Sequence, residues 1–324
     1  MIIPPFLLPG DKVAIISPAG DVRRELIERG AELLERQGFQ VEIGRHAFDR
    51  SGVFAGSDAA RAADMQQSLD DESIKAIVFS RGGYGCLRTH LLLDWSAFLN
   101  RPKWLVGFSD ITVFHAFLSR HGIASLHGVM TSSFESESQP ADSFLQMLGV
   151  LRGELSDHAV VPHPLNRSGI ASGVLTGGNL SIIQSLRGTR LDILPQGKIL
   201  FIEDVHELLY HLDRMMQNLK AGGILEQLSG LIVGHFTGMR DGRTPYGRTA
   251  CEIISEAVAP YAYPVVFGFP AGHKRPNHPL LLGGRITLEV SAAGAQVRCA
   301  AEESSWIDRD QAVERLPIRW GRGV

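Results

Sequence analysis

The sequence predicts an α/β protein with a parallel sheet in the first half of the chain and a mixed sheet in the second. Short apolar runs alternate with helical patterns through about residue 125, which is typical of a parallel sheet covered by helices on both faces. Near the other end, 285–290 and 295–300 flank Ser-Ala-Ala-Gly in a hairpin pattern. The chain has 324 residues, more than one hydrophobic core usually serves, so we expect two domains.

The first half contains four expected strands with helices between them. The strands are placed at 12–17, 39–43, 75–80 and 104–106. The helices are placed at 21–38, with Asp21 as cap and Gly38 as stop, and at 59–69, 87–93 and 113–122. Ligands of parallel sheets bind beyond the carboxyl ends of the strands, so Ser17, Arg81 to Gly85 and Ser109 should converge.

Between about residues 132 and 168 the periodicity fades in a segment rich in Ser, Glu and Pro, with one helix expected at 143–151. We place the domain boundary there, which gives a first domain at 1–155 and a second at 156–324. The strands of the second half are placed at 173–175, 198–203, 228–233, 264–268, 285–290 and 295–300. Its helices are expected after a Gly177-Gly178-Asn179 turn and from Leu208 to Leu219.

The composition is that of an ordinary globular protein without a basic excess. A net charge of -3 argues against a nucleic-acid or membrane-surface partner. The three cysteines show no CxxC spacing, so neither a disulfide framework nor a zinc site is expected. The N-terminal segment has no basic region and is cut by prolines, which argues against a signal peptide or membrane span and predicts a cytoplasmic protein. The basic cluster near the C-terminus is expected to be a solvated tail, and it comprises Arg315, Arg319 and Arg322.

The stretch from Lys103 to Leu118 changes from strand to helix with no room for a loop. Trp104-Leu-Val is a buried-strand pattern, and the residues from Val113 onward have the spacing of an amphipathic helix. A serine at the apex of so sharp a turn, Ser109, holds its hydroxyl above the helix N-terminus, as in a nucleophile elbow. The alternative is that Ser109 caps the helix, and the stretch taken alone favours the cap because the full G-x-S-x-G pattern is absent.

A glycine-rich turn follows the neighbouring strand. Gly82-Gly83 offers unhindered backbone N–H groups that suit an oxyanion hole formed together with the N–H of Asp110. The alternative is a turn that cradles a phosphate. Against it, Arg81-Gly-Gly-Tyr-Gly lacks both the G-x-G-x-x-G pattern and the lysine of a P-loop.

The base and the acid are harder to choose. Composition cannot select among 12 histidines, but His273 follows a strand in a Gly/Pro-rich loop, where a side chain can be aimed without being buried. A solvated loop histidine is the commoner case. Glu203 ends a buried strand, where its charge must find a partner. The alternative for Glu203 is a cap for the next helix, a role that Asp204 could also fill.

Several blocks in a fixed order carry a resemblance to a known family. They are Ser80-Arg-Gly-Gly-Tyr-Gly, Gly107-Phe-Ser-Asp-Ile-Thr, Thr176-Gly-Gly-Asn-Leu-Ser, Leu200-Phe-Ile-Glu-Asp-Val with Asp213-Arg214, and Gly272-His273. With the opening Pro9-Gly-Asp-Lys-Val-Ala-Ile-Ile-Ser they run from residue 9 to about 283, and jointly they are specific. In these blocks the chain resembles the LD-carboxypeptidases, a family of serine peptidases.

The resemblance implies a metal-independent triad without a cofactor: Ser109 as nucleophile, His273 as general base and Glu203 as the acid that orients the histidine. The oxyanion would be held by backbone N–H groups near Gly83 and Asp110. The resemblance also implies a flavodoxin-like N-terminal domain that bears the nucleophile and a smaller, barrel-like C-terminal domain that bears the acid and the base. The site would be a cleft between the domains, and homodimers are frequent in the family.

The usual family substrate is a murein tetrapeptide, which loses its terminal D-alanine across an L-to-D peptide bond during cell-wall recycling. The alternative is a branch resembling the microcin C immunity protein, which cleaves peptidyl or aminoacyl adenylate-like toxins. This chain has Val205-His206-Glu207 where many relatives have Gly, and Lys274 where many have Gly after the histidine. Because both differences adjoin the expected triad, they leave the substrate preference open.

Arg81 and Tyr84 are weaker candidates for contacts with the peptide. An arginine is the expected partner of its carboxylate, but the sequence does not distinguish Arg81, Arg214 and Arg275. Two other classes are disfavoured. A nucleotide- or NAD-using protein would need the missing phosphate fingerprint, and a non-catalytic binding protein finds no support because none of the three triad positions is degenerate.

Overall fold

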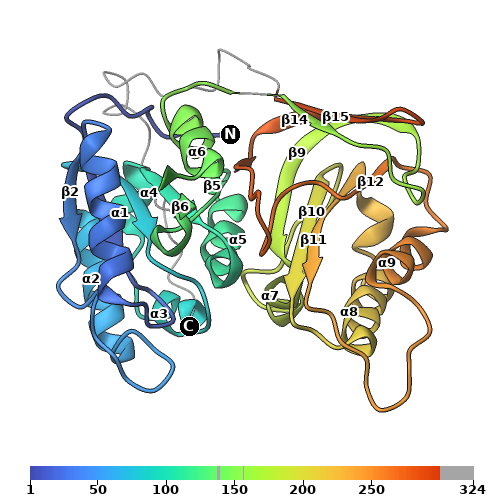
Figure 1. The fold of residues 1–324 in the computed structure, drawn as a ribbon, viewed down its shortest axis with the longest axis horizontal. Coiled ribbons are helices and arrows are strands. Elements are labelled where there is room, and N and C mark those ends of the chain that lie inside the picture. The colour runs from blue at the N-terminus through green and yellow to red at the C-terminus, as the bar shows by residue number, and fades with distance from the viewer. Residues whose placement is uncertain (137–138, 156, 300–324) are drawn as a thin grey trace, which may run out of the picture.

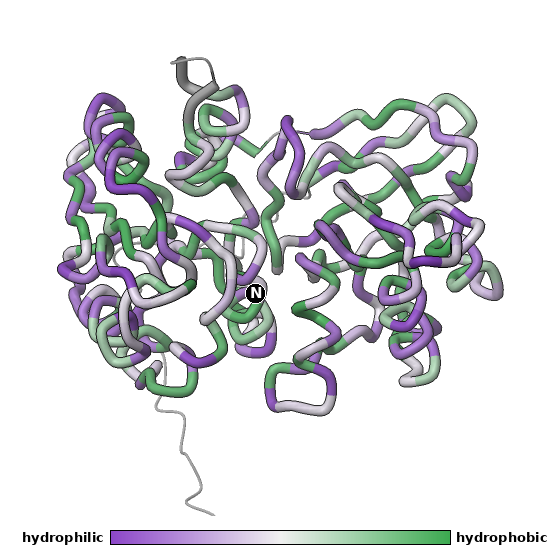
Figure 2. Tube along the Cα trace, turned by 60° about the horizontal axis from the view of Figure 1, so that its bottom comes forward, coloured by the Kyte–Doolittle hydropathy of each residue, from purple (hydrophilic) through white to green (hydrophobic). Residues whose placement is uncertain are grey.

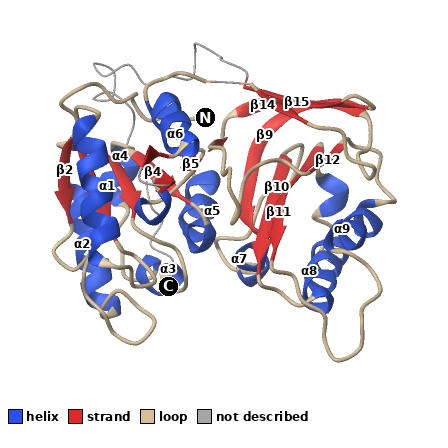
Figure 3. Cartoon of the chain, in the orientation of Figure 1, coloured by secondary structure: helices blue, strands red, loops and turns tan. Residues whose placement is uncertain are grey.

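The computed structural model describes residues 1–136, 139–155 and 157–299, and it contains two α/β units that lie side by side (Figure 1). Each unit has its own sheet with helices packed against it, so the prediction of an α/β protein is confirmed (Figure 3). The expected basic tail lies outside the described residues. Among the helices of the described part, none is long and apolar enough to cross a membrane.

The first sheet has six strands in the order β13-β5-β4-β3-β1-β2. Their bounds are β1 Lys12–Ile16, β2 Gln40–Ile43, β3 Ile74–Phe79, β4 Trp104–Gly107, β5 Ser125–His127 and β13 Leu280–Leu282. The five strands from the first half of the chain are parallel and follow the order 2-1-3-4-5, which is that of flavodoxin-like sheets. The sixth, β13, comes from the second half and pairs antiparallel with β5.

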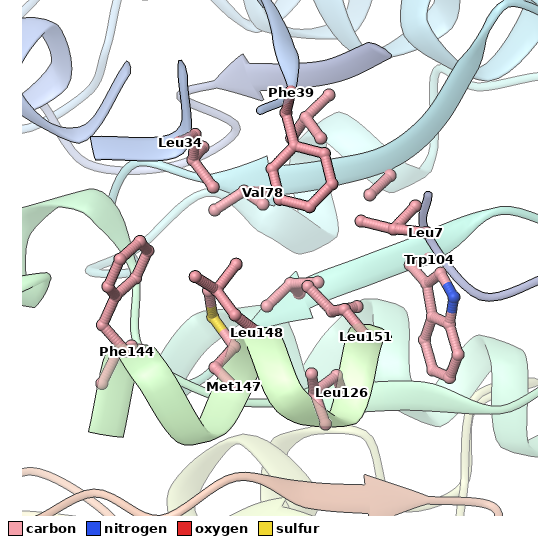
Figure 4. Close-up of a cluster of buried hydrophobic side chains, with 14 of the residues drawn as sticks. Leu7, Leu34, Phe39, Val78, Trp104, Leu126, Phe144, Met147, Leu148 and Leu151 are labelled. Atoms are coloured by element: carbon pink, nitrogen blue, oxygen red, sulfur yellow. The ribbon is translucent and has the colours of Figure 1, made fainter. Parts of the chain in front are cut away.

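Helices cover both faces of this sheet because its strands are apolar on both. The helices are α1 Arg24–Arg36, α2 Asp58–Asp70, α3 Cys86–His90, α4 Ser96–Asn100, α5 Thr112–Arg120 and α6 Asp142–Leu151. Hydrophobic and hydrophilic residues are mixed along the helices that cover the sheet, as expected for helices with one buried side (Figure 2). Along β1 the side chains alternate between faces, so Val13 and Ile15 join one core and Ala14 and Ile16 the other. Figure 4 shows the first core, where the apolar side chains of α6 face Leu34, Phe39 and Val78, and Trp104 lies at one side of the cluster.

The second sheet is mixed, in the order β12-β11-β10-β9-β14-β15-β8. Its strands are β8 His158–Val160, β9 Gly169–Asn179, β10 Ile199–Val205, β11 Gly230–Thr237, β12 Val265–Phe267, β14 Arg285–Ser291 and β15 Gly294–Cys299. The pairs from β12 to β9 are parallel and the others are antiparallel. Just before β9, Arg167 exchanges two backbone hydrogen bonds with Val265 of β12, at 2.9 and 3.1 Å, so the sheet curls back on itself in a barrel-like way.

Within the described residues, the helices of the second unit are α7 Leu180–Ser185, α8 Leu209–Ala221 and α9 Ala250–Val258. The remaining short elements are β6 Glu135–Ser136, β7 Gln139–Pro140 and the 3-10 turns η1 Ser109–Ile111, η2 Thr131–Ser133 and η3 Leu225–Gln227. The elements that the sequence did not predict are mostly three to five residues long, too short for a periodic pattern. Helix α9 is longer, and its capping box of Thr249 and Glu252 was a usable signal.

Two local predictions were wrong. Asp21 does not cap α1, because the helix begins at Arg24 with Arg23 in the capping position, and the Asp21 carboxylate pairs with Arg50 at 2.7 Å instead. Gly177-Gly178 is not a turn but the end of β9. The proposed division at residue 155 stays a prediction, and β13 shows that the two halves of the chain share one sheet.

The double glycine in β9 reflects two close approaches. Gly177 has φ +128°, and a side chain there would overlap the carbonyl group of Phe201 on β10. At Gly178, with φ +139°, a Cβ would lie 2.5 Å from Oγ1 of Thr112 at the start of α5. Thr112 Oγ1 also accepts the backbone N–H of Asn179 at 3.0 Å. The glycines therefore let β9 of the second unit press against α5 of the first.

We expect Gly177→Ala to lower the free energy of unfolding by roughly 3 kcal/mol or more, because overpacking adds to an unfavourable backbone conformation. The control is Gly188→Ala, since Gly188 has φ +75° with open space around it. This variant should lower the free energy of unfolding by about 1–2 kcal/mol, through the backbone conformation alone. Denaturant unfolding measures both. Equal losses would contradict the close approach.

Candidate active site

Ser109 sits at the sharp turn between β4 and α5, as its sequence context predicted. Its φ is +66°, a left-handed conformation that is uncommon for residues other than glycine and is often stored at functional sites. The capping position of α5 is occupied by Ile111, so Ser109 is not the N-cap of this helix. The Ser109 hydroxyl instead lies 3.0 Å from Nε2 of His273.

His273 lies between Ser109 and Glu203, although the three residues are far apart in sequence. Its Nδ1 is 2.7 Å from Oε2 of Glu203, and its Nε2 is the atom that faces Ser109. A carboxylate accepts, so Nδ1–H donates to Glu203 and Nε2 is left to accept from the serine hydroxyl. The Phe108 ring packs edge-on against the imidazole at 4.9 Å and limits its movement. The structure thus brings together all three residues expected to form a triad.

Glu203 is fully buried near the end of β10. Its Oε1 accepts from Nδ2 of Asn179 at 3.3 Å, while Oε2 takes the bond from the histidine. Burial acts to lower the pKa of His273, but the hydrogen bond and charge of Glu203, with the charge of Asp204, outweigh it and raise that pKa above its ordinary value. The buried acid therefore makes His273 a stronger base.

Asp204 has a different role from its neighbour. It accepts the backbone N–H of Ser181 at 2.9 Å and that of Val205 at 2.8 Å, and Nδ2 of Asn179 at 3.0 Å. Burial raises its pKa to about 6. Asp204 thus binds an N–H in the first turn of α7, whose N-cap is Asn179, and it does not cap the helix that follows, which begins after Leu208 without a side-chain cap.

Of the two expected oxyanion groups, Gly83 lies in the turn after β3, and Asp110 directly follows Ser109 in η1. A Cβ on Gly82 would lie 2.8 Å from Cβ and 3.0 Å from Oγ of Ser109, and 3.2 Å from the backbone nitrogen of Asp110. Next to it, Gly83 has φ +102° and packs against the Gly20 backbone. The Asp110 carboxylate accepts the N–H of Cys86 at 2.7 Å, and burial raises its pKa. These contacts hold the glycine turn against the serine.

Arg81 and Tyr84 follow the same strand, β3, but their side chains contact other parts of the chain. The Arg81 guanidinium donates to the Asp21 carbonyl at 2.7 Å, and the exposed Tyr84 ring packs against Phe54 at 5.6 Å. Neither lines the cavity beside the histidine. Of the other arginines, Arg214 stacks over a tyrosine of α8 at 5.3 Å. Arg275 is the candidate among the three that lines this cavity.

The cavity next to His273 has a volume of about 390 Å³. It is lined by Phe108, Val129, Ser133, Ala141, Asp142, Ser143, Gly272, His273, Lys274, Arg275, Pro276 and Asn277. Lys274 thus belongs to the cavity wall, whereas His206 is exposed at the end of β10 with φ +61°. The sequence had not identified the contributions of η2 and α6, because nothing in those segments has a chemical pattern.

Among the described residues, no cluster of histidine, cysteine or acidic side chains could hold a metal ion, and the three cysteines are free. The three groups that meet at the site are a hydroxyl, an imidazole and a carboxylate. A serine in a left-handed turn, bonded to a histidine that is bonded to a buried carboxylate, is typical of α/β enzymes of the serine hydrolase class.

Two parts of the chain match the two domains of one protein family. Residues 13–128 match the LD-carboxypeptidase N-terminal domain, and residues 172–288 match the LD-carboxypeptidase C-terminal domain. The chain therefore belongs to the LD-carboxypeptidase family, a family of serine carboxypeptidases.

Relatives and solved structures cover nearly the whole chain. The murein tetrapeptide carboxypeptidase of Pseudomonas aeruginosa is 30% identical over 287 residues, 86% of this chain and 93% of the relative. The probable murein peptide carboxypeptidase of Bacillus subtilis is 29% identical, over 93% of this chain and 96% of the relative. The structure of muramoyltetrapeptide carboxypeptidase from Oxalobacter formigenes gives a TM-score of 0.81 at 29% identity, with 89% of this chain and 98% of that chain covered.

The microcin C7 self-immunity protein MccF has the same fold. Its complex with glutamyl sulfamoyl guanosine gives a TM-score of 0.81 at 20% identity, over 93% of this chain and 99% of that chain. At this identity the likeness concerns the fold alone.

We expect Glu203→Gln to lower kcat about 10⁴-fold, since the amide no longer fixes the histidine tautomer. The acidic limb of kcat/KM should also move to lower pH, because burial then lowers the pKa of His273 without the opposing charge of Glu203. The control is Glu207→Gln, which alters a second Glu–His pair, to His211 at 3.2 Å, outside the site. If Glu203→Gln has the same pH–rate profile as the wild type, the pairing of Glu203 with His273 is contradicted.

Gly82→Ala should lower kcat by about 10²-fold, because the new methyl group displaces Ser109 and a misplacement of about 1 Å has an effect of that size. Gly128→Ala is the matched control, since a Cβ there makes an ordinary contact of 3.4 Å with Met147. Kinetics and the unfolding midpoint are measured together. If both variants keep full activity, the glycine turn does not determine the position of the serine.

Proposed function

We propose that this protein is a metal-independent serine LD-carboxypeptidase with Ser109, His273 and Glu203 as its triad. The observation that carries the proposal is the continuous hydrogen-bonded chain from the serine hydroxyl through the imidazole to a fully buried carboxylate. In this arrangement each group has the partner that its role requires.

In the proposed mechanism, His273 takes the proton of the Ser109 hydroxyl as Oγ bonds to the scissile carbonyl carbon. The charge that develops on the carbonyl oxygen is stabilised by the backbone N–H groups of Gly83 and Asp110. When the C–N bond breaks, His273 gives its proton to the leaving amine. A water molecule then gives a proton to the same histidine as its oxygen bonds to the acyl carbon, and when the bond from that carbon to Oγ breaks, the histidine returns the proton to Ser109. Glu203 stays ionised and holds the imidazole in one tautomer throughout.

The proposed substrate is a murein tetrapeptide that loses its terminal D-alanine. Relatives at about 30% identity are named as carboxypeptidases of murein peptides. The cavity beside His273 suits a small charged peptide, because Lys274 and Arg275 line it together with Asp142. A cytoplasmic location and a homodimer, both expected from the sequence, stay predictions.

The test is release of D-alanine from purified murein tetrapeptide by wild type and Ser109→Ala, each with and without EDTA. We expect release by the wild type in both conditions. The variant should be silent, because loss of a triad nucleophile lowers the rate about a million-fold.

Each other outcome has a distinct meaning. Equal release by Ser109→Ala would remove the serine from the mechanism, and loss of activity with EDTA would contradict metal independence. If the wild type releases nothing, the murein substrate is wrong, and aminoacyl-adenylate analogues are the next substrates to assay.

A further inference from the structure

The loop that carries His273 runs between β12 of the second sheet and β13 of the first. Its backbone passes directly over the buried acid, since a Cβ on Gly272 would lie 2.8 Å from Oε2 of Glu203. Gly272 has φ +123°, a conformation that other residues rarely adopt. Because Gly272 precedes the histidine, the position of its peptide group sets where the imidazole points.

One buried side chain binds the N–H of that peptide group, whose carbonyl oxygen, on Ala271, accepts the backbone N–H of His235 on β11 at 2.8 Å. Oδ1 of Asn277 accepts the Gly272 N–H at 2.8 Å and lies 3.3 Å from Nε2 of His127. Since the Gly272 N–H identifies this atom as the oxygen, Nε2–H of His127 is the second donor. Burial lowers the pKa of His127 to about 3, so the ring is neutral and keeps one N–H to donate.

Asn277 also joins the loop to the first unit of the structure. Its backbone N–H donates to Oγ of Ser143 on α6 at 3.0 Å, and His127 belongs to β5. The histidine loop is encoded in the second half of the chain. Asn277 and His273 nevertheless tie it to the unit that carries Ser109 as well.

The amide of Asn277 is used through its oxygen. The residue is 5% exposed, and Nδ2 has no hydrogen-bond partner within the described part of the chain. A buried backbone N–H needs a hydrogen-bond acceptor. Without Oδ1 of Asn277, the Gly272 N–H would be unpaired and would carry the full free-energy cost of its desolvation.

We propose that Asn277 is a positioning residue for the reaction. By accepting from Gly272 and His127 it fixes the loop conformation that holds His273 between Glu203 and Ser109. The proposal rests on the proposed catalytic roles of Ser109 and His273. It is distinct from a substrate contact, which Asn277 could also make as part of the cavity wall.

Three variants separate these roles. Asn277→Leu keeps the approximate volume but removes the acceptor, and Asn277→Asp keeps an acceptor oxygen. The matched control is Asn166→Leu, because Oδ1 of the half-buried Asn166 accepts the N–H of Phe267 on β12 at 2.8 Å, away from the site. Each variant is assayed for kcat and KM on the tetrapeptide, for the pH profile, for its unfolding midpoint and for the rate at which a fluorophosphonate labels Ser109.

We expect Asn277→Leu to lower kcat and the labelling rate about 10–100-fold with KM nearly unchanged, since a small misplacement of the base has an effect of this size. The acidic limb should move to lower pH, because a looser bond to Glu203 raises the pKa of His273 less. Asn277→Asp should recover most of kcat. Asn166→Leu should lower the unfolding midpoint but leave kcat and the pH profile in place.

The proposal is overturned if folded Asn277→Leu keeps the wild-type kcat and labelling rate. It is also overturned if this variant loses no more kcat than Asn166→Leu does, or if only its KM rises. A folded Asn277→Asp as inactive as the leucine variant also overturns it. Where the leucine variant does not fold, Asn277→Ala replaces it. Labelling of Ser109 needs no peptide, so slower labelling in a protein that cleaves no tetrapeptide would support the role of Asn277 while refuting the proposed substrate.

Discussion

The geometry of the site depends on one row of backbone pairing that crosses three strands. In the first sheet, Gly107 of β4 pairs with His127 of β5, and His127 pairs with Leu280 of β13. Ser109 follows the first of these residues by two positions, and the histidine loop ends just before the last. The hydroxyl and the imidazole are therefore set by a common sheet, although they are 164 residues apart in the chain. Sheets are stiff across paired strands, so this distance is better defined than one that depends on the packing of two domains.

The second sheet supplies the acid, and its attachment to the first unit is local. Gly178 and Asn179 press against Thr112 directly behind the serine turn, and Asn179 donates to both Glu203 and Asp204. One asparagine thus links the start of α5 to the acid strand. The expectation of a site formed where two domains meet is consistent with this contact, and the base is held from both sides, by Glu203 at Nδ1 and through Asn277 by the unit of the nucleophile.

Ser109 and its turn were predictable because a strand that becomes a helix without a loop leaves a detectable change of period. Glu203 was predictable as a charge on a buried strand. His273 was selected among 12 histidines through the order of blocks in the chain, which carries information that composition lacks. Asn277 was not found, since an asparagine in a Pro-rich loop has no pattern that reveals its partners. The pairing of β13 with β5 was equally hidden, because a run of three leucines does not specify which sheet it joins.

The position of two adjacent acids on one buried strand explains the polar surroundings of the site. Burying two carboxylates side by side is unfavourable, and the fold compensates by giving Asp204 donors from Asn179, Ser181 and Val205. Compensation is incomplete, since the pKa of Asp204 is raised from 3.8 to about 6. Protonated Asp204 thus favours the folded state: this contribution is full below pH 3.8 and is lost as the pH rises through about 6. At neutral pH the fold gives up that stability, and the two negative charges both act to raise the pKa of His273. The two adjacent carboxylates therefore lower the stability of the fold at neutral pH and raise the basicity of the His273 imidazole.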